Sequence, residues 1–285
     1  AGRVSGPPPW AYLALFCGCL LIGLWSAQTF DAVVIWPANG VMLAALLQLH
    51  RRPAIRVLAA CLAINLAANV VRGDPMPFLW LNAVVNFAQV CLAGLIARRV
   101  CGAALDLRRP RRLANFALLA VAPAVFLSAI GMLSVAHAVH SYSLIKFLFT
   151  LHRYFEMEAL GLLIVAPALL LIAKSHRFRR SAPASSLETV ALMALLAGVT
   201  VATFAQSMMP IAFVIFPLLV LVAFRLSPSW VAGAVIMLAV IGGTATVTGH
   251  GPASLMRLPP VAGLESVPDV IRHLNLYYLF LLMVI

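Results

Sequence analysis

Polar side chains inside long apolar stretches are the residues of this sequence that can do chemistry. A carboxylate such as Glu158, which precedes the apolar run Ala-Leu-Gly-Leu-Leu-Ile, must pair, take up a proton or bind a ligand if hydrocarbon surrounds it. Two other apolar stretches carry amide side chains, namely Asn65 and Asn69 in one and Asn82, Asn86 and Gln89 in the other. The spacing of three or four residues places each set on one face of a helix.

A further amide, Asn39, lies in the run 36–40, Trp-Pro-Ala-Asn-Gly. If the apolar stretches cross a membrane alternately, this run, the amides and Glu158 all lie toward the outer side. We therefore predict a ligand-binding pocket in the outer half of the membrane, formed by Trp36, Asn39, Asn65, Asn69, Asn82, Asn86 and Glu158. A structural role is the alternative, because amides commonly bridge helices. Trp and Pro also suit a membrane interface and a helix start.

Two arginines are candidates for coupling. Arg153 lies five residues before Glu158 and is the nearest candidate for an ion pair with the acid, although five residues is not helical spacing. Arg225 ends a later apolar stretch, where it could link the membrane region to the cytoplasm. Snorkelling of its guanidinium to the interface is the simpler explanation.

The histidines and the known catalytic motifs give little support to an enzyme. His137 and His140 are spaced i, i+3 and His152 and Glu156 i, i+4, which is a spacing that could hold a metal. Interfacial histidines are also common without one, and no cysteine accompanies them, so we predict no metal and no other cofactor. Because the sequence has no phosphate-binding loop, HExxH or GxSxG motif, we predict no catalytic residue in this region.

The composition determines what must position these residues. Of the 285 residues, 64% are hydrophobic and 10% are charged, whereas soluble domains have about 25% charged residues. Backbone groups in hydrocarbon must be satisfied within helices or closed barrels, and the apolar runs are continuous rather than alternating. We therefore predict an all-α, polytopic transmembrane helix bundle of about ten spans. These spans are 8–27, 34–49, 53–71, 77–98, 113–136, 147–173, 187–207, 210–225, 229–248 and 268–285.

The basic residues provide an independent test of the spans. The net charge is +12, and most of the 20 Lys and Arg residues fall on the same side as the N-terminus when the ten spans are drawn. Positive charge marks the cytoplasmic side, so we expect both termini in the cytoplasm. Arginines at helix ends also explain the charge without nucleic acid, which we exclude as a partner. The predicted partners are the lipid bilayer and an unknown small ligand.

Several short motifs resemble, in order, the bacterial membrane-associated sensor domain of type one, in the MASE family. They are Trp36-Pro37-Ala38-Asn39-Gly40 with Arg51-Arg52, Asn65, Asn86, Glu158-Ala159-Leu160-Gly161 with Ala166-Pro167, Phe216-Pro217-Leu218-Leu219 with Arg225, Gly243-Thr244, and Gly249-His250-Gly251-Pro252. Two departures are Glu158, where the family has Asp, and Leu226-Ser227, where it has Phe-Gly.

The resemblance implies a role that spacing alone does not give. Such domains are N-terminal input modules of diguanylate cyclases and histidine kinases in the inner membrane. Their outputs work as dimers, so we expect this protein to form a homodimer. We therefore expect residues 1–285 to form one membrane sensor domain, with a cytoplasmic output domain after residue 285. The polar, basic stretch 174–186 is a candidate linker between sub-bundles 8–173 and 187–285.

Two other functions remain open from the sequence. Ten spans with buried amides and an acid also suit a secondary transporter of a small polar solute, although two halves with paired broken helices are not evident. A scaffold that uses the basic runs 108–112 and 174–180 is the third interpretation, and the same runs could bind anionic lipid.

Overall fold

The computed structural model describes residues 7–30, 33–101, 107, 109–173, 185–256, 264 and 267–284. Every regular element within these ranges is helical, which confirms the all-α prediction. The helices are α1 (Pro9–Phe30), α2 (Ala38–Gln48), α3 (Arg51–Arg72), α4 (Phe78–Val100), α5 (Pro110–Asn115), the π-helical η1 (Phe116–Val121), α6 (Ala122–His140), α7 (Leu144–Ala173), α8 (Ser186–Ala205), the 3-10 turn η3 (Ala212–Val214), α9 (Ile215–Arg225), α10 (Pro228–Val247), the 3-10 turn η4 (Pro252–Leu255) and α11 (Asp269–Val284).

Each predicted span coincides with a helix or a continuous helical run. Among the described residues, seven helices are long and apolar enough to cross a membrane, and α2 and the run 212–225 are shorter apolar helices. α2 has 11 residues and is about 16 Å long, roughly half of a hydrocarbon core of about 30 Å. A helical membrane protein is thus confirmed, whereas the count of ten crossings stays a prediction. The linker residues 174–184, Arg108 and Ile285 lie outside the described residues.

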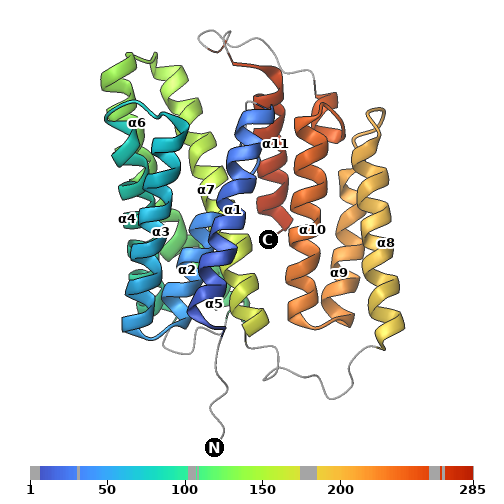
Figure 1. The fold of residues 1–285 in the computed structure, drawn as a ribbon. Coiled ribbons are helices and arrows are strands. Elements are labelled where there is room, and N and C mark those ends of the chain that lie inside the picture. The colour runs from blue at the N-terminus through green and yellow to red at the C-terminus, as the bar shows by residue number, and fades with distance from the viewer. Residues whose placement is uncertain are drawn as a thin grey trace, which may run out of the picture. The chain divides into compact units, whose positions relative to one another are not determined.

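The chain divides into two compact units, which we call unit 1 (1–25 and 36–170) and unit 2 (26–35 and 171–285). In unit 1, α4 is the central helix, because α2, α3 and the α5–α6 run all pack against it (Figure 1). Small residues on its buried face, among them Ala93 and Ala97, permit this close packing. Leu43 and Leu46 of α2 lie against Gly94 of α4.

α2 begins beside the middle of α7 because two glycines remove the side chains that would separate them. A Cβ atom on Gly40 would lie 2.4 Å from the carbonyl oxygen of Gly161, and one on Gly161 would lie 2.1 Å from the carbonyl oxygen of Trp36. The first N–H groups of a helix have no intrahelical acceptor, so a helix that starts inside a membrane must start within protein. The first eight residues of α2, 38–45, are accordingly buried.

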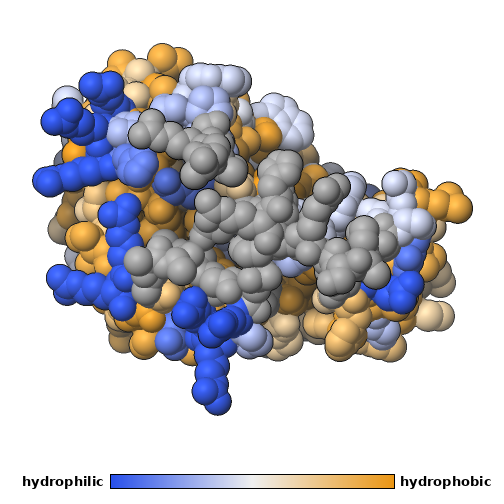
Figure 2. Space-filling view, turned by 90° about the horizontal axis from the view of Figure 1, so that it is seen from below, coloured by the Kyte–Doolittle hydropathy of each residue, from blue (hydrophilic) through white to orange (hydrophobic). Residues whose placement is uncertain are grey.

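One end of unit 1 gathers arginines. Exposed guanidiniums lie at the start of α3, at the end of α4 and before α5, from Arg51, Arg52, Arg98, Arg99 and Arg109. Arg98 Nη2 donates a hydrogen bond to the carbonyl oxygen of Leu46, 2.5 Å away, and so satisfies one of the last carbonyls of α2. Figure 2 shows hydrophilic side chains gathered on the face that is seen from below. The opposite end of these helices carries Arg72 and Asp74.

Unit 2 packs α8, α9 and α11 against α10. The Tyr277 hydroxyl donates hydrogen bonds to the carbonyl oxygens of Leu238 and Ala239 in α10, at 2.9 and 3.1 Å. Its ring lies over Gly242, where a Cβ atom would come within 2.6 Å of it. An edge-to-face contact with Phe204, with centroids 5.6 Å apart, extends this packing to α8. Unit 2 is therefore held by aromatic side chains seated on small residues of α10.

The close approach at Gly161 generates a stability prediction. Because the nearest atoms to an added methyl group are backbone atoms of Trp36, Gly161→Ala must displace that segment, and we expect a loss of ~1–3 kcal/mol in the free energy of unfolding. Gly198→Ala in α8 is the matched control, since a Cβ atom there meets nothing within 4 Å. It should be neutral or stabilise by up to ~1 kcal/mol. Thermal unfolding in detergent measures both variants, and equal melting temperatures would contradict the packing described here.

Candidate functional site

Glu158 is the centre of a buried polar network in unit 1. Its side chain is 2% exposed, and Oε2 accepts hydrogen bonds from Asn39 Nδ2 at 2.7 Å and from Gln89 Nε2 at 3.0 Å. The three residues come from α7, α2 and α4, so this carboxylate joins three helices at one point. A buried charge needs such partners, because leaving it without them would be very costly.

The network continues from Gln89 into α6. The Ser128 hydroxyl donates to Gln89 Oε1 and also lies 2.8 Å from the carbonyl oxygen of Val125 in its own helix. Gln89 therefore uses its carbonyl oxygen toward Ser128 and its amide nitrogen toward Glu158. This gives a continuous chain of hydrogen bonds from α6 through α4 to α7 and α2.

Four buried polar atoms lie on a member of the network or one helical turn from a member along the chain. They are Trp36 Nε1, Asn39 Oδ1, Asn86 Oδ1 and the Tyr154 hydroxyl, and none has a hydrogen-bond partner among the described residues. Each such group costs about 1–3 kcal/mol when it is left unsatisfied. Buried groups of this kind normally pair with water or a ligand, so the surroundings of Glu158 have the character of a binding site.

Trp36 has a different environment from a membrane-interface tryptophan. It is 8% exposed, and its ring lies against Gly23 of α1, where a Cβ atom would come within 2.7 Å. The structure thus places Trp36 and Asn39 together at the start of α2, beside Gly161 of α7.

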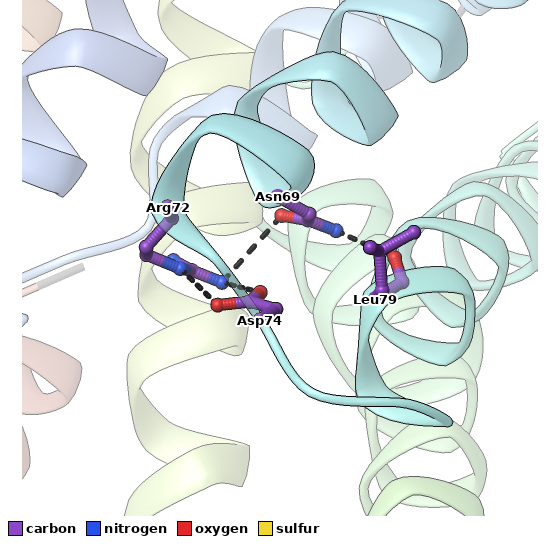
Figure 3. A network of polar contacts seen from close by, with 4 residues as sticks. All are labelled: Asn69, Arg72, Asp74 and Leu79. Atoms are coloured by element: carbon purple, nitrogen blue, oxygen red, sulfur yellow. Dashed lines mark hydrogen bonds and ion pairs between the residues drawn. The ribbon is translucent and has the colours of Figure 1, made fainter.

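Asn69 belongs to a separate network at the turn between α3 and α4 (Figure 3). Its Nδ2 donates to the carbonyl oxygen of Leu79 at 2.9 Å, and its Oδ1 accepts from Arg72 at 3.5 Å. Arg72 also pairs with Asp74 through Nε, 2.6 Å from Oδ1. Gly73 ends α3 in a left-handed conformation with φ of 76°. These contacts fix the turn, which favours the structural alternative for Asn69.

The remaining predicted site residues are not part of the Glu158 network. Asn65 is buried on α3 and Asn82 is half-buried on α4, and neither joins the hydrogen bonds to Glu158. Arg153 is half-buried, and no ion pair links it to Glu158, whose carboxylate is held by two neutral amides instead. The candidate pairing of Arg153 with the acid is therefore absent from this arrangement.

His137, His140 and His152 all belong to unit 1, and no ligand set for a metal occurs among the described residues. His152 Nε2 lies 3.1 Å from Glu156 Oε1. His137 and His140 contact aromatic rings instead, with Phe147 and Phe78 at centroid distances of 5.8 Å. Aromatic packing therefore accounts for these two side chains.

Arg225 has a partner that the sequence analysis did not name. Its Nε donates to Glu188 Oε1 at 2.6 Å, and Nη2 lies 2.5 Å from the same oxygen. Glu188 stands in the first turn of α8, whose N-cap Ser185 accepts a hydrogen bond from the Glu188 N–H at 3.0 Å. The ion pair thus ties the end of α9 to the start of α8.

Two residues of the network, and one that lies a helical turn from it along the chain, were absent from the predicted site. Gln89 is detectable by spacing, because it follows Asn86 by three residues on the same face. Tyr154 precedes Glu158 by one helical turn and gives the same weak signal. Ser128 has none, since a single serine in an apolar helix often bonds its own backbone.

Of three comparisons with known proteins, one identifies a family. The MASE1 family model matches residues 8–255 and so includes every member of the Glu158 network. A search of curated proteins and a search of solved structures both find no match to the chain. Because the family model covers most of the chain, the protein belongs to the MASE1 family of membrane-associated sensor domains.

Proposed function

We propose that this chain detects a signal at the Glu158 network and regulates a C-terminal cytoplasmic output, a diguanylate cyclase or a histidine kinase. Membership of the MASE1 family implies a membrane sensory input module. The observation that carries the proposal is the buried Glu158 carboxylate, held by Asn39 and Gln89 and neighboured by polar atoms without partners among the described residues. Nothing in that arrangement is a nucleophile beside a base, which supports a binding role rather than catalysis.

The network supplies a physical route from binding to helix movement. A ligand changes a protein's conformation only by binding one state better than another. A polar ligand that bonds Asn39, Gln89 or Glu158 competes with the bonds that hold α2, α4 and α7 together. We propose that this competition alters the packing of the three helices and, in a homodimer of the inner membrane, the arrangement of the output domains.

The distribution of charge supports the proposed orientation, with both ends in the cytoplasm. The arginines of unit 1 gather at the end where α2 ends and α3 begins. Positive charge is enriched on the cytoplasmic side, so this end faces inward. The turn around Asp74 and the segment around Ser141 then face outward, and the Glu158 network lies between them and the arginine end.

The proposal predicts that Glu158→Gln weakens signalling without unfolding the protein. The substitution keeps the shape and one oxygen that can accept from both amides, but it removes the negative charge that strengthens these bonds and puts an NH2 donor in place of the second carboxylate oxygen. We expect this to cost about 1–3 kcal/mol in the signalling-competent packing. In the full-length protein, we expect at least a fivefold change in basal output or in its response to growth conditions, measured as cyclic-di-GMP synthesis or autophosphorylation in membranes. Glu156→Gln, the same change two residues away, is the control and should behave as wild type.

We expect the Arg225–Glu188 ion pair to affect the coupling of the membrane region to the output more than the stability of the protein. The side chains are 59% and 28% exposed, and exposed pairs contribute only about 0–1 kcal/mol. We expect Arg225→Glu and Glu188→Arg each to reduce the output response while the melting temperature shifts by a few degrees at most. The double variant restores opposite charges and should recover the response. A double variant that is no better than either single one would rule out this role.

If the proposed orientation is correct, cysteines placed in the outward-facing segments should be labelled from outside the cell, whereas a cysteine at the arginine end should not. In a background without the native cysteines, Ser143→Cys and His250→Cys should react with a membrane-impermeant maleimide in intact cells. Arg109→Cys should react only after permeabilisation. Labelling of Arg109→Cys in intact cells would invert the proposed topology.

A further inference from the structure

A groove runs between α4 and α6 in unit 1. Its volume is about 230 Å³, and its walls are mostly apolar, from residues such as Val85, Leu92 and Leu127. Gly131 also lines it, and a Cβ atom on this glycine would meet nothing within 4 Å. Small-molecule sites commonly enclose about 300–1,000 Å³, so this groove has room for part of a ligand.

The groove has a polar floor that belongs to the Glu158 network. Both Gln89 and Ser128 line it, although the Gln89 side chain is only 1% exposed. The Gln89 amide nitrogen carries two hydrogens and donates one of them to Glu158. No second acceptor for this nitrogen lies among the described residues. One N–H group of this groove-lining side chain therefore has no acceptor among the described residues.

The groove opens on a surface suited to lipid rather than to water. Leu127 on its rim is 59% exposed, and the neighbouring Phe126 and Val84 are 47% and 51% exposed. Gln89 lies equally far from both ends of α4, a helix long and apolar enough to cross a membrane. A ligand reaches this floor through the hydrocarbon of the bilayer.

The depth of Gln89 in the membrane limits which kinds of ligand can bind there. Half of a hydrocarbon core of about 30 Å separates the middle of α4 from the headgroups, so a phospholipid offers only its acyl chains there. A charged group is costly at this depth, whereas a neutral carbonyl is not. The matching occupant has an apolar body, no charge and one carbonyl oxygen.

We propose that the α4–α6 groove binds an uncharged, membrane-dissolved amphiphile whose carbonyl oxygen accepts a hydrogen bond from Gln89. The binding site stands on the groove itself, while the claim that this ligand is the signal rests on the proposed function of the Glu158 network. Binding at Gln89 polarises the amide that holds Glu158, so occupancy of the groove alters the carboxylate that joins α2, α4 and α7.

Photolabelling of the full-length protein in phospholipid nanodiscs tests this site. The probe is 2-pentadecanone with a diazirine on its chain, and mass spectrometry locates the labelled peptides. We expect labels on α4 and α6, suppressed at least tenfold by excess 2-pentadecanone but not by pentadecane, which has the same chain without a carbonyl. Gly131→Leu, which fills the groove, should reduce labelling at least fivefold. Gly198→Leu is the control in α8 and should label like wild type.

The outcomes separate this inference from the sensory proposal. If pentadecane competes as well as the ketone, or if Gly131→Leu labels like wild type, the groove merely holds hydrocarbon and the inference fails. The ketone and alkane comparison uses the wild-type protein, so it decides the question even if Gly131→Leu does not fold. If the ketone labels the groove specifically but Glu158→Gln leaves the output unchanged, the ligand site stands and the sensory proposal fails.

Discussion

The cost of placing a carboxylate in hydrocarbon is the constraint on which the structure of unit 1 depends. Glu158 lies within a helix long enough to span a membrane, and it is held there only because Asn39 and Gln89 bring amide donors to one of its oxygens. For Asn39 to reach it, α2 must start inside the bundle. This position of the start of α2 requires a glycine at residue 161, because a Cβ atom there would collide with the backbone of Trp36. The short helix α2, the glycines at its contact with α7 and the buried Glu158 therefore depend on one another.

The sequence predicted the positions of the helices better than the hydrogen-bond partners of the polar side chains on them. Continuous apolar runs identify helices because hydrocarbon leaves the backbone little choice, and all ten ranges coincide with helical elements. Helical spacing also placed Asn86 and Gln89 on one face. It could not show that Gln89 rather than Arg153 meets Glu158, because the partner is set by how helices from distant parts of the chain pack. Asn69 shows a second limit of sequence reasoning, because helical spacing gives no sign that its amide bonds the carbonyl oxygen of Leu79 beyond a nearby turn.

The two acids of α7 illustrate why burial alone does not identify a site. Glu156 and Glu158 are 1% and 2% exposed, and both precede a long apolar run. Successive residues of a helix point in different directions, so residues two apart lie on nearly opposite faces. Glu156 has His152 as its neighbour on its own helix, whereas Glu158 receives bonds from two other helices. Only the second arrangement makes the relative position of helices depend on a polar contact.

A network of this kind is hard to explain by stability. Replacing buried polar groups by apolar groups of similar shape is often neutral or stabilising, whereas a partly satisfied network is costly. Here Asn39 and Asn86 each keep a buried oxygen without a partner among the described residues. Apolar residues at these positions would avoid that cost, although in a bilayer they would join the three helices by van der Waals packing alone. Hydrogen bonds that can exchange partners are compatible with more than one packing, which is the property that the proposed sensory role requires.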